Sequence, residues 1–132
     1  VLFSPWLDLT GSGSIDPGAA EDPLVNRQAL ATMAAWYAGD ALTYALVSPL
    51  FGDFRGLPPL QIQVGTRELL LDDARRARTR ARDCGVTLDY VEAESLIHVW
   101  PVLAPDAPES ARALARAARF MAAHSNNARP PG

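Results

Sequence analysis

Along the chain, segments with apolar residues at every second position alternate with segments whose apolar residues are three or four positions apart. The first pattern predicts strands and the second predicts helices. Strands are expected at residues 1–3, 60–64 and 86–91. Ser4-Pro5 ends the first of them, because proline cannot donate to a strand ladder. In the second, Gln61 and Gln63 alternate with apolar residues, which predicts one less-buried face.

Helices are expected between these strands. The first should run from Asp22, as N-cap with Pro23 at the first helical position, to a stop at Gly39. Its apolar face is expected to hold Leu30, Met33, Ala34 and Tyr37. The aromatic residues Trp36, Tyr37 and Tyr44 favour packing over a cofactor site.

The second and last helices have narrow apolar faces. The second should end before Gly85 and carry the stripe Leu70, Ala74, Ala77, Ala81 and Cys84. Its arginines should form a solvated face on the other side. The last helix should begin near residues 106–109 and bury Ala111, Leu114, Ala115, Ala118 and Met121.

The order of elements predicts an α/β fold with a parallel sheet and right-handed crossovers. Three strands with alanine-rich helices offer more apolar surface than they can mutually cover. Residues 1–124 are therefore expected to be part of one larger domain, and residues 125–132 a disordered tail. Because the chain opens on the strand-like Val1-Leu2-Phe3, it is expected to be cut from a longer protein. On its own it should oligomerise or be poorly stable.

Composition excludes several function classes. The 132 residues are 48% hydrophobic and 20% charged, with a net charge of −3, so nothing favours nucleic acid or an anionic membrane as partner. All 12 cationic residues are arginine, which indicates genomic bias. Cys84 alone can form neither an internal disulfide nor a cysteine-based zinc site. No apolar run reaches the roughly 20 residues of a membrane span, and a cytoplasmic location is expected.

Glu68 and His98 are the candidate catalytic residues. Each lies in a loop just after a predicted strand, at the sheet edge where parallel α/β sheets hold their active groups. A carboxylate there can hold the tautomer of a histidine that acts as general base. Two alternatives stay open: Glu68 as an acid that stabilises the helix N-terminus, and His98 as a loop histidine satisfied by the backbone.

Other polar residues fit lesser roles. Asp72 and Asp73 compete with Glu68 as the acid, but their place in a helical first turn favours solvated pairing with arginines. Asp8 follows the first strand and is expected to support the site or to bind substrate. His124 is read as structural, and two well-separated histidines predict no metal site.

No nucleophile is evident. None of the seven serines has the G-x-S-x-G context that exposes a hydroxyl at a strand-to-helix turn. The GSGS at residues 11–14 has the wrong register, and Cys84 lies on an apolar helix face, a poor environment for a thiolate.

Several motifs together resemble the C-terminal part of α/β-hydrolases, specifically the hormone-sensitive-lipase-like bacterial esterases and monoterpene lactone hydrolases. They are SPWLDLT (4–10), DP (22–23), SPLFGDFRGLPPLQIQVGTRELLLDDA (48–74), CGVTLDYVE (84–92) and IHVWP (97–101). The similarity runs to about Phe120. Two segments depart from the family: Ser95-Leu96 stands where Gly-Met is frequent, and residues 42–46 lack the usual Asp-Pro-rich linker.

The resemblance implies a carboxylic ester hydrolase with a Ser-Glu-His triad. Glu68 would be the acid and His98 the base, and the strands would be the last three of an eight-stranded sheet. Because the family order is serine, acid, histidine, the nucleophile and the HGGG-type oxyanion loop would lie in a missing N-terminal part, which is therefore an expected partner. The implied substrate is a small acyl ester or lactone, with Asp8, Trp36 and Val99 as candidate binding residues and no cofactor. The alternative is a non-catalytic remnant that only self-associates or binds.

Overall fold

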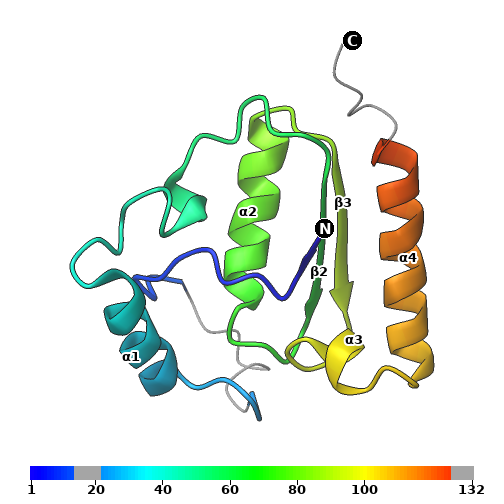
Figure 1. Cartoon of the computed structure of the whole chain (residues 1–132), viewed down its shortest axis with the longest axis horizontal. Helices are drawn as coiled ribbons and strands as arrows, with labels where there is room; N and C mark the ends of the chain where they lie inside the picture. Colours follow the sequence, from blue (N-terminus) through cyan, green and yellow to red (C-terminus); the bar gives the residue numbers. More distant parts are fainter. Residues whose placement is uncertain (14–21, 126–132) are drawn as a thin grey trace.

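The computed structural model describes residues 1–13 and 22–125 and contains a three-stranded parallel sheet. Its strands are β1 (Leu2–Phe3), β2 (Leu60–Gly65) and β3 (Leu88–Ala93), in that order across the sheet. Figure 1 shows β2 and β3 running side by side, with β1 reaching the sheet near the N-terminus. The predicted α/β class and parallel sheet are confirmed. Residues 126–132 of the predicted tail lie outside the described residues.

Helix α2 (Leu71–Asp83) covers one face of the sheet (Figure 1). Its alanine stripe packs at close range on β2: Ala74 and Ala81 are fully buried, as are Ile62 and Val64 of the strand. Leu7 and the short 3-10 helix η2 (Pro49–Phe51) close the same core through Leu50. The helix ends before Gly85, whose positive φ of 70° suits a residue without a Cβ. The predicted stripe and stop are therefore confirmed.

The arginines of α2 do not form the purely solvated face that their clustering predicted. Arg75 forms an ion pair with Glu92 of β3 at 2.8 Å, and Arg76 one with Asp8 at 2.7 Å. The Arg78 guanidinium lies over the Tyr90 ring, and Arg80 donates to the Gly52 carbonyl at 2.6 Å. Because the residues flanking the helix in space carry acids, rings and carbonyls, these long side chains bridge α2 to its neighbours.

Helix α4 (Pro108–Ser125) covers the opposite face, and it buries a different set of residues from those predicted. The face toward the sheet carries Ser110, Ala113 and Ala117, whereas Leu114 and Met121 are 43% and 54% exposed. Gln63 explains why this face of α4 turns toward the sheet. Its side-chain amide donates to the Ala113 carbonyl at 3.0 Å, and this bond requires the helix to lie close to β2.

The two strand glutamines are consequently not on a less-buried face. Gln61 and Gln63 are both buried, and the Gln63 amide also donates to the Gln61 side chain oxygen at 3.0 Å. The Gln61 amide donates to Asp89 of β3 at 2.6 Å. Buried amides are tolerated here because strand and helix groups satisfy them.

Helix α1 (Arg27–Ala38) begins later than predicted, with Asn26 as its N-cap. The Asn26 side chain accepts from the Ala29 amide at 2.8 Å. Asp22 instead accepts from the amides of Leu24 and Val25, and its other oxygen accepts from the Leu69 amide at 3.0 Å. Asp22 therefore joins the approach to α1 to the loop before α2. The helix ends before Gly39, as predicted.

The predicted apolar face of α1 stays largely uncovered. Ala34 is buried, but Met33 and Tyr37 are 43% and 72% exposed. Trp36 and Tyr44, expected to pack, are 82% and 58% exposed. Figure 1 shows that α1 stands away from the strands. Uncovered apolar surface agrees with the expectation for three strands with narrow alanine faces.

No helix among residues 1–13 and 22–125 is both long enough and apolar enough to cross a membrane.

Replacing Ala74 with Leu is expected to lower the free energy of unfolding by about 1–3 kcal/mol, because no space exists between α2 and β2 for three more carbons. Urea denaturation of the chain measures the change. Ala111→Leu provides the matched control at an exposed position of α4, where the effect should stay within about 0.5 kcal/mol. Equal losses in the two variants would contradict the packing described here.

Candidate active site

Glu68 and His98 meet at the carboxyl ends of β2 and β3. Glu68 lies in the loop between β2 and α2, and His98 in the turn between β3 and the short helix α3 (Trp100–Leu103). The His98 Nδ1 atom lies 3.0 Å from Glu68 Oε2. The carboxylate is fully buried, while the imidazole keeps 21% of its surface exposed. When Nδ1 donates to the carboxylate, Nε2 is left as an acceptor.

The second carboxylate oxygen of Glu68 is held by two other segments. Oε1 accepts from the Gly65 amide at 2.5 Å and from the Ser4 hydroxyl at 2.8 Å. Helix α2 begins at Leu71 without a side-chain cap, so the Glu68 side chain turns back to the strand end instead of capping the helix. Of the two roles left open for His98, its ring contacts a carboxylate rather than the backbone.

Gly65 is a site residue that the sequence analysis did not single out. A Cβ at this position would lie 2.2 Å from the Leu96 carbonyl oxygen and 3.0 Å from Glu68 Oε1. The Arg67 amide donates to that same Leu96 carbonyl at 3.1 Å, and the Ser95 amide donates to the Thr66 hydroxyl at 2.9 Å. The loops that carry the acid and the histidine are thus bound directly to each other. A glycine three residues before a candidate acid was the available signal.

All three non-glycine residues with positive φ in the described chain surround the acid and the histidine. They are Ser4 at 47°, Ser95 at 60° and Val99 at 46°. Positive φ is a genuine outlier for a β-branched residue such as Val99. Strain of this kind persists only where the surroundings fix the backbone, and it concentrates at functional sites.

A cavity of about 250 Å³ opens beside His98. Its wall is mainly apolar and comes from α1, the segment before it, and the residue that precedes α2. Its aliphatic residues are Leu24, Val25, Ala29, Leu30, Met33 and Leu70. Trp6 and Ser4 complete it near the end of β1. The imidazole therefore contacts an anion on one side and apolar space on another.

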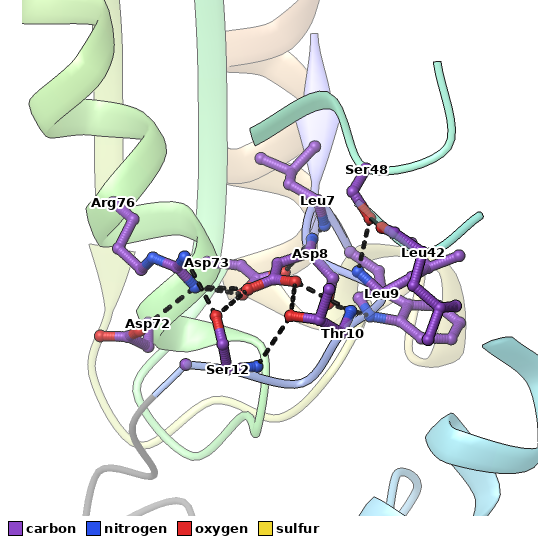
Figure 2. Close-up of polar contacts among 12 residues, drawn as sticks. Leu7, Asp8, Leu9, Thr10, Ser12, Leu42, Ser48, Asp72, Asp73 and Arg76 are labelled. Carbon is purple, nitrogen blue, oxygen red and sulfur yellow. Dashed lines mark hydrogen bonds and ion pairs between the residues drawn. The ribbon is translucent and has the colours of Figure 1, made fainter. Parts of the chain in front are cut away.

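Asp8 is a buried carboxylate at the centre of a polar network (Figure 2). One of its oxygens accepts from the Thr10 amide and hydroxyl, and the other from the Ser12 hydroxyl at 2.6 Å and from Arg76 at 2.7 Å. Burial raises the pKa of Asp8, but the hydroxyls of Ser12 and Thr10 and the Arg76 guanidinium outweigh it, so the pKa is lowered. The Asp8 side chain is fully buried, and the residue also lines a second cavity of about 380 Å³ whose wall includes residues of α1.

Asp73 is not the solvated helix acid that its position predicted. It is 6% exposed, and its carboxylate accepts from the Leu7 and Asp8 amides, each at 2.8 Å. Burial raises its pKa, with the nearby Asp8 charge adding to the rise. Asp72 does pair with Arg76 at 4.0 Å, as expected. Together, Asp8 and Asp73 fix the segment after β1 to α2.

Two of the other predicted residues, Trp36 and His124, lie apart from the Glu68–His98 contact, whereas Val99 directly follows His98. Trp36 projects from α1, 82% exposed, and is not part of the cavity wall beside His98. Val99 is half-buried, and its amide donates to the Ser4 hydroxyl at 3.0 Å. His124 bonds through Nδ1 to the Phe120 carbonyl at 2.8 Å within α4, as a structural histidine does.

Neither a metal site nor a serine partner for His98 is found in the described part of the chain. Residues 1–13 and 22–125 contain no group of three or more His, Cys, Asp or Glu side chains able to hold a metal ion. Within the same residues, no serine hydroxyl hydrogen-bonds to the His98 ring. The Ser4, Ser48 and Ser110 hydroxyls bond to Glu68, the Leu42 carbonyl and the Trp100 carbonyl.

A family model described as the alpha/beta hydrolase fold matches residues 1–102. This chain belongs to the α/β-hydrolase family. The acid and histidine loops both fall inside the matched region, as do all three strands.

Similar proteins of this hydrolase family are esterases. An acetyl-hydrolase of Streptomyces hygroscopicus is 40% identical over 123 residues, covering 92% of this chain and 41% of the relative. An esterase of Acinetobacter venetianus is 36% identical over 123 residues, covering 91% of this chain and 41% of the relative. The crystal structure of an esterase from the bacterial hormone-sensitive lipase family superposes with a TM-score of 0.87 at 41% identity, covering 93% of this chain and 42% of that one. The chain thus spans about two fifths of the length of these relatives.

Replacing Asp8 with Asn is expected to lower the free energy of unfolding by about 1–3 kcal/mol at neutral pH, because the carboxylate loses its charge-assisted hydrogen bonds from Arg76 and Ser12. Since the pKa of Asp8 is lowered from 3.8, its carboxylate contributes stability above about pH 4 that is lost as the pH falls through the folded-state value. The variant should therefore lose less stability than the unchanged chain between about pH 5 and pH 3. Urea denaturation across this range measures the effect, with the exposed Asp40→Asn as control. If Asp8→Asn and the unchanged chain lost equal stability as the pH fell over this range, the stabilising role of the Asp8 carboxylate would be contradicted.

Replacing Gly65 with Ala is expected to cost about 3 kcal/mol or more, because the new Cβ would collide with backbone rather than with a movable side chain. The Glu68 and His98 loops should separate, with loss of the His98 Nδ1–H resonance in the NMR spectrum. Gly52→Ala is the comparison, since its Cβ would lie 3.2 Å from the nearest backbone oxygen and needs only a small shift. If the two variants are equally stable, the close approach of Gly65 and Leu96 is refuted.

Proposed function

We propose that Glu68 and His98 are the acid and the base of a Ser-Glu-His triad in a carboxylic ester hydrolase. One observation carries the proposal: a fully buried carboxylate holds Nδ1 of a half-buried histidine at 3.0 Å, beside an apolar cavity. That arrangement leaves Nε2 as the acceptor, which is the tautomer a general base requires. Membership of a family with esterases among its relatives supports the same reading.

The nucleophilic serine is proposed to come from sequence outside these 132 residues. No serine of the chain has the G-x-S-x-G context, and the chain spans about 41% of the curated esterase relatives. The donors that stabilise an oxyanion would come from the same missing part. We therefore propose that this chain is the acid-and-base part of the enzyme and is inactive by itself.

The proposed reaction is acyl transfer in two steps. His98 Nε2 takes the serine proton as the serine oxygen attacks the ester carbonyl carbon, and Glu68 stabilises the resulting imidazolium. The imidazolium returns the proton to the departing alcohol oxygen, which leaves an acyl-serine. Water then attacks the acyl carbon with His98 again as base, and the carboxylic acid is released.

The cavity beside His98 supports a small ester or lactone as the substrate. Its volume of about 250 Å³ and its aliphatic wall suit a short acyl or alcohol group. No cofactor is needed, because the serine would supply the nucleophile and His98 would carry out each proton transfer. The relative named acetyl-hydrolase fits a small acyl group.

A non-catalytic, self-associating module is the second candidate. The exposed apolar side chains favour it, with Trp36 at 82% and Leu46 at 77% of their surface open. Sedimentation of the chain over a concentration series measures self-association. Together with the activity test below, it distinguishes the module from the esterase. The module would be favoured if the chain associates and if adding an N-terminal part gives no catalytic activity.

The test is a fusion of this chain to the part of the Streptomyces acetyl-hydrolase that it does not match. A fluorophosphonate probe should label the fusion and not the 132-residue chain, since only the fusion has an activated serine. Hydrolysis of p-nitrophenyl butyrate by the fusion should fall about 10³- to 10⁴-fold in His98→Ala and Glu68→Gln, because the base or its correct tautomer is lost.

His124→Ala is the matched control, because this histidine bonds only within α4, and it should leave hydrolysis unchanged. Circular dichroism confirms that each variant is folded. Full activity in folded His98→Ala would overturn the proposal. Labelling of the 132-residue chain that disappears in His98→Ala would show instead that one of its own serines is the nucleophile.

A further inference from the structure

The Ser4 hydroxyl joins the two loops of the candidate active site at one atom. It donates to Glu68 Oε1 at 2.8 Å, and it accepts from the Val99 amide at 3.0 Å. The direction of both bonds is fixed, because an amide can only donate and the hydroxyl has a single proton to give. Residues far apart in sequence therefore share this buried oxygen, and one of them directly follows His98.

The backbone of Ser4 is held in the conformation that aims its side chain at the site. Its amide donates to the Gln63 carbonyl at 2.8 Å, which extends the pairing of β1 with β2 by one residue. Its φ of 47° lies in the left-handed region, at a position where it is 4% exposed. A serine keeps this strained geometry here while it forms both side-chain bonds, which is typical of a residue with a positioning role.

We propose that Ser4 is a positioning residue for the Glu68–His98 pair, a role that rests on the proposed function. Glutamate has three side-chain torsions, so a carboxylate that meets His98 through one oxygen needs its other oxygen fixed. Ser4 and Gly65 supply the two donors that fix it. The hydroxyl also satisfies the Val99 amide, and this bond holds the strained turn that sets the direction of the imidazole.

Loss of the hydroxyl has two local consequences. Glu68 Oε1 would keep only the Gly65 donor, and the Val99 amide would have no partner in a half-buried turn. The carboxylate and the imidazole could then rotate independently, so Nδ1 would no longer always carry the proton. A mixed tautomer population lowers the share of histidine that can act as a base through Nε2.

Imidazole ¹⁵N shifts of His98 in the 132-residue chain test the role, because they report the tautomer without any nucleophile. The variants are Ser4→Ala and Ser4→Gly; both remove the hydroxyl, and glycine also relieves the positive φ. Both should change His98 from one tautomer to a mixture and should accelerate hydrogen exchange of the Val99 amide by about tenfold or more. Ser48→Ala is the matched control, since Ser48 is a fully buried serine that also donates one bond and accepts one, away from His98.

A serine needed only for folding would give a different result. The variants would then melt at a lower temperature, or fail to fold, while any folded fraction kept a single His98 tautomer, and the proposal would be overturned. Equal tautomer shifts in Ser48→Ala would also overturn it.

The esterase fusion provides the catalytic measurement. Ser4→Gly should lower kcat about 10- to 100-fold with little change in KM, as expected for a displaced base. An unchanged kcat would overturn the proposal. If the fusion itself hydrolyses no ester, the proposed function fails, whereas the tautomer measurement still decides the role of Ser4.

Discussion

The buried carboxylate of Glu68 is the group on which the site depends. A charge without exposed surface is stable only when hydrogen bonds replace its water, and here three segments of the chain supply them. The end of β1 contributes Ser4, the end of β2 contributes Gly65, and the turn after β3 contributes His98. Because the donors come from all three strands, the acid can be satisfied only when the whole sheet edge is assembled. The position of His98 therefore depends on the same pairing of strands that stabilises the fold.

Small residues permit this arrangement. Gly65 has no Cβ, which lets the Leu96 carbonyl approach and brings the two loops into hydrogen-bonding contact. Behind the loops, Ala74 and Ala81 let α2 lie close on β2, so the start of the helix follows the acid after a short turn. The ion pair between the buried Asp8 and Arg76 then holds the segment after β1 against the same helix. The same close packing of the elements thus also sets the positions of the residues in the site.

Both faces of the sheet are covered by helices, but other apolar surface of the chain is exposed. One face carries an aliphatic core under α2, and the other is covered by α4 through glutamine side chains. By contrast, Trp36 and Tyr37 on α1 remain largely exposed. The loops that carry Glu68 and His98 are therefore joined by hydrogen bonds within the chain, whereas apolar surface on α1 is left uncovered. This division agrees with a chain that spans about two fifths of its esterase relatives.

The sequence by itself determined the features that depend on local pattern. Strand and helix periods predicted the parallel order, the alanine stripe of α2 and its stop at Gly85, and the place of Glu68 and His98 after neighbouring strands put them at one edge. Only the tertiary structure decided which partner each polar side chain finds. Gln63 reverses the expected exposure of its strand face because α4 presents the Ala113 carbonyl to it, and Asp73 is buried because the Leu7 and Asp8 amides lie opposite. Ser4 is the clearest case: 64 residues separate it from Glu68, and no periodicity carries information across that distance, so its hydroxyl gains a role only when the strands pair.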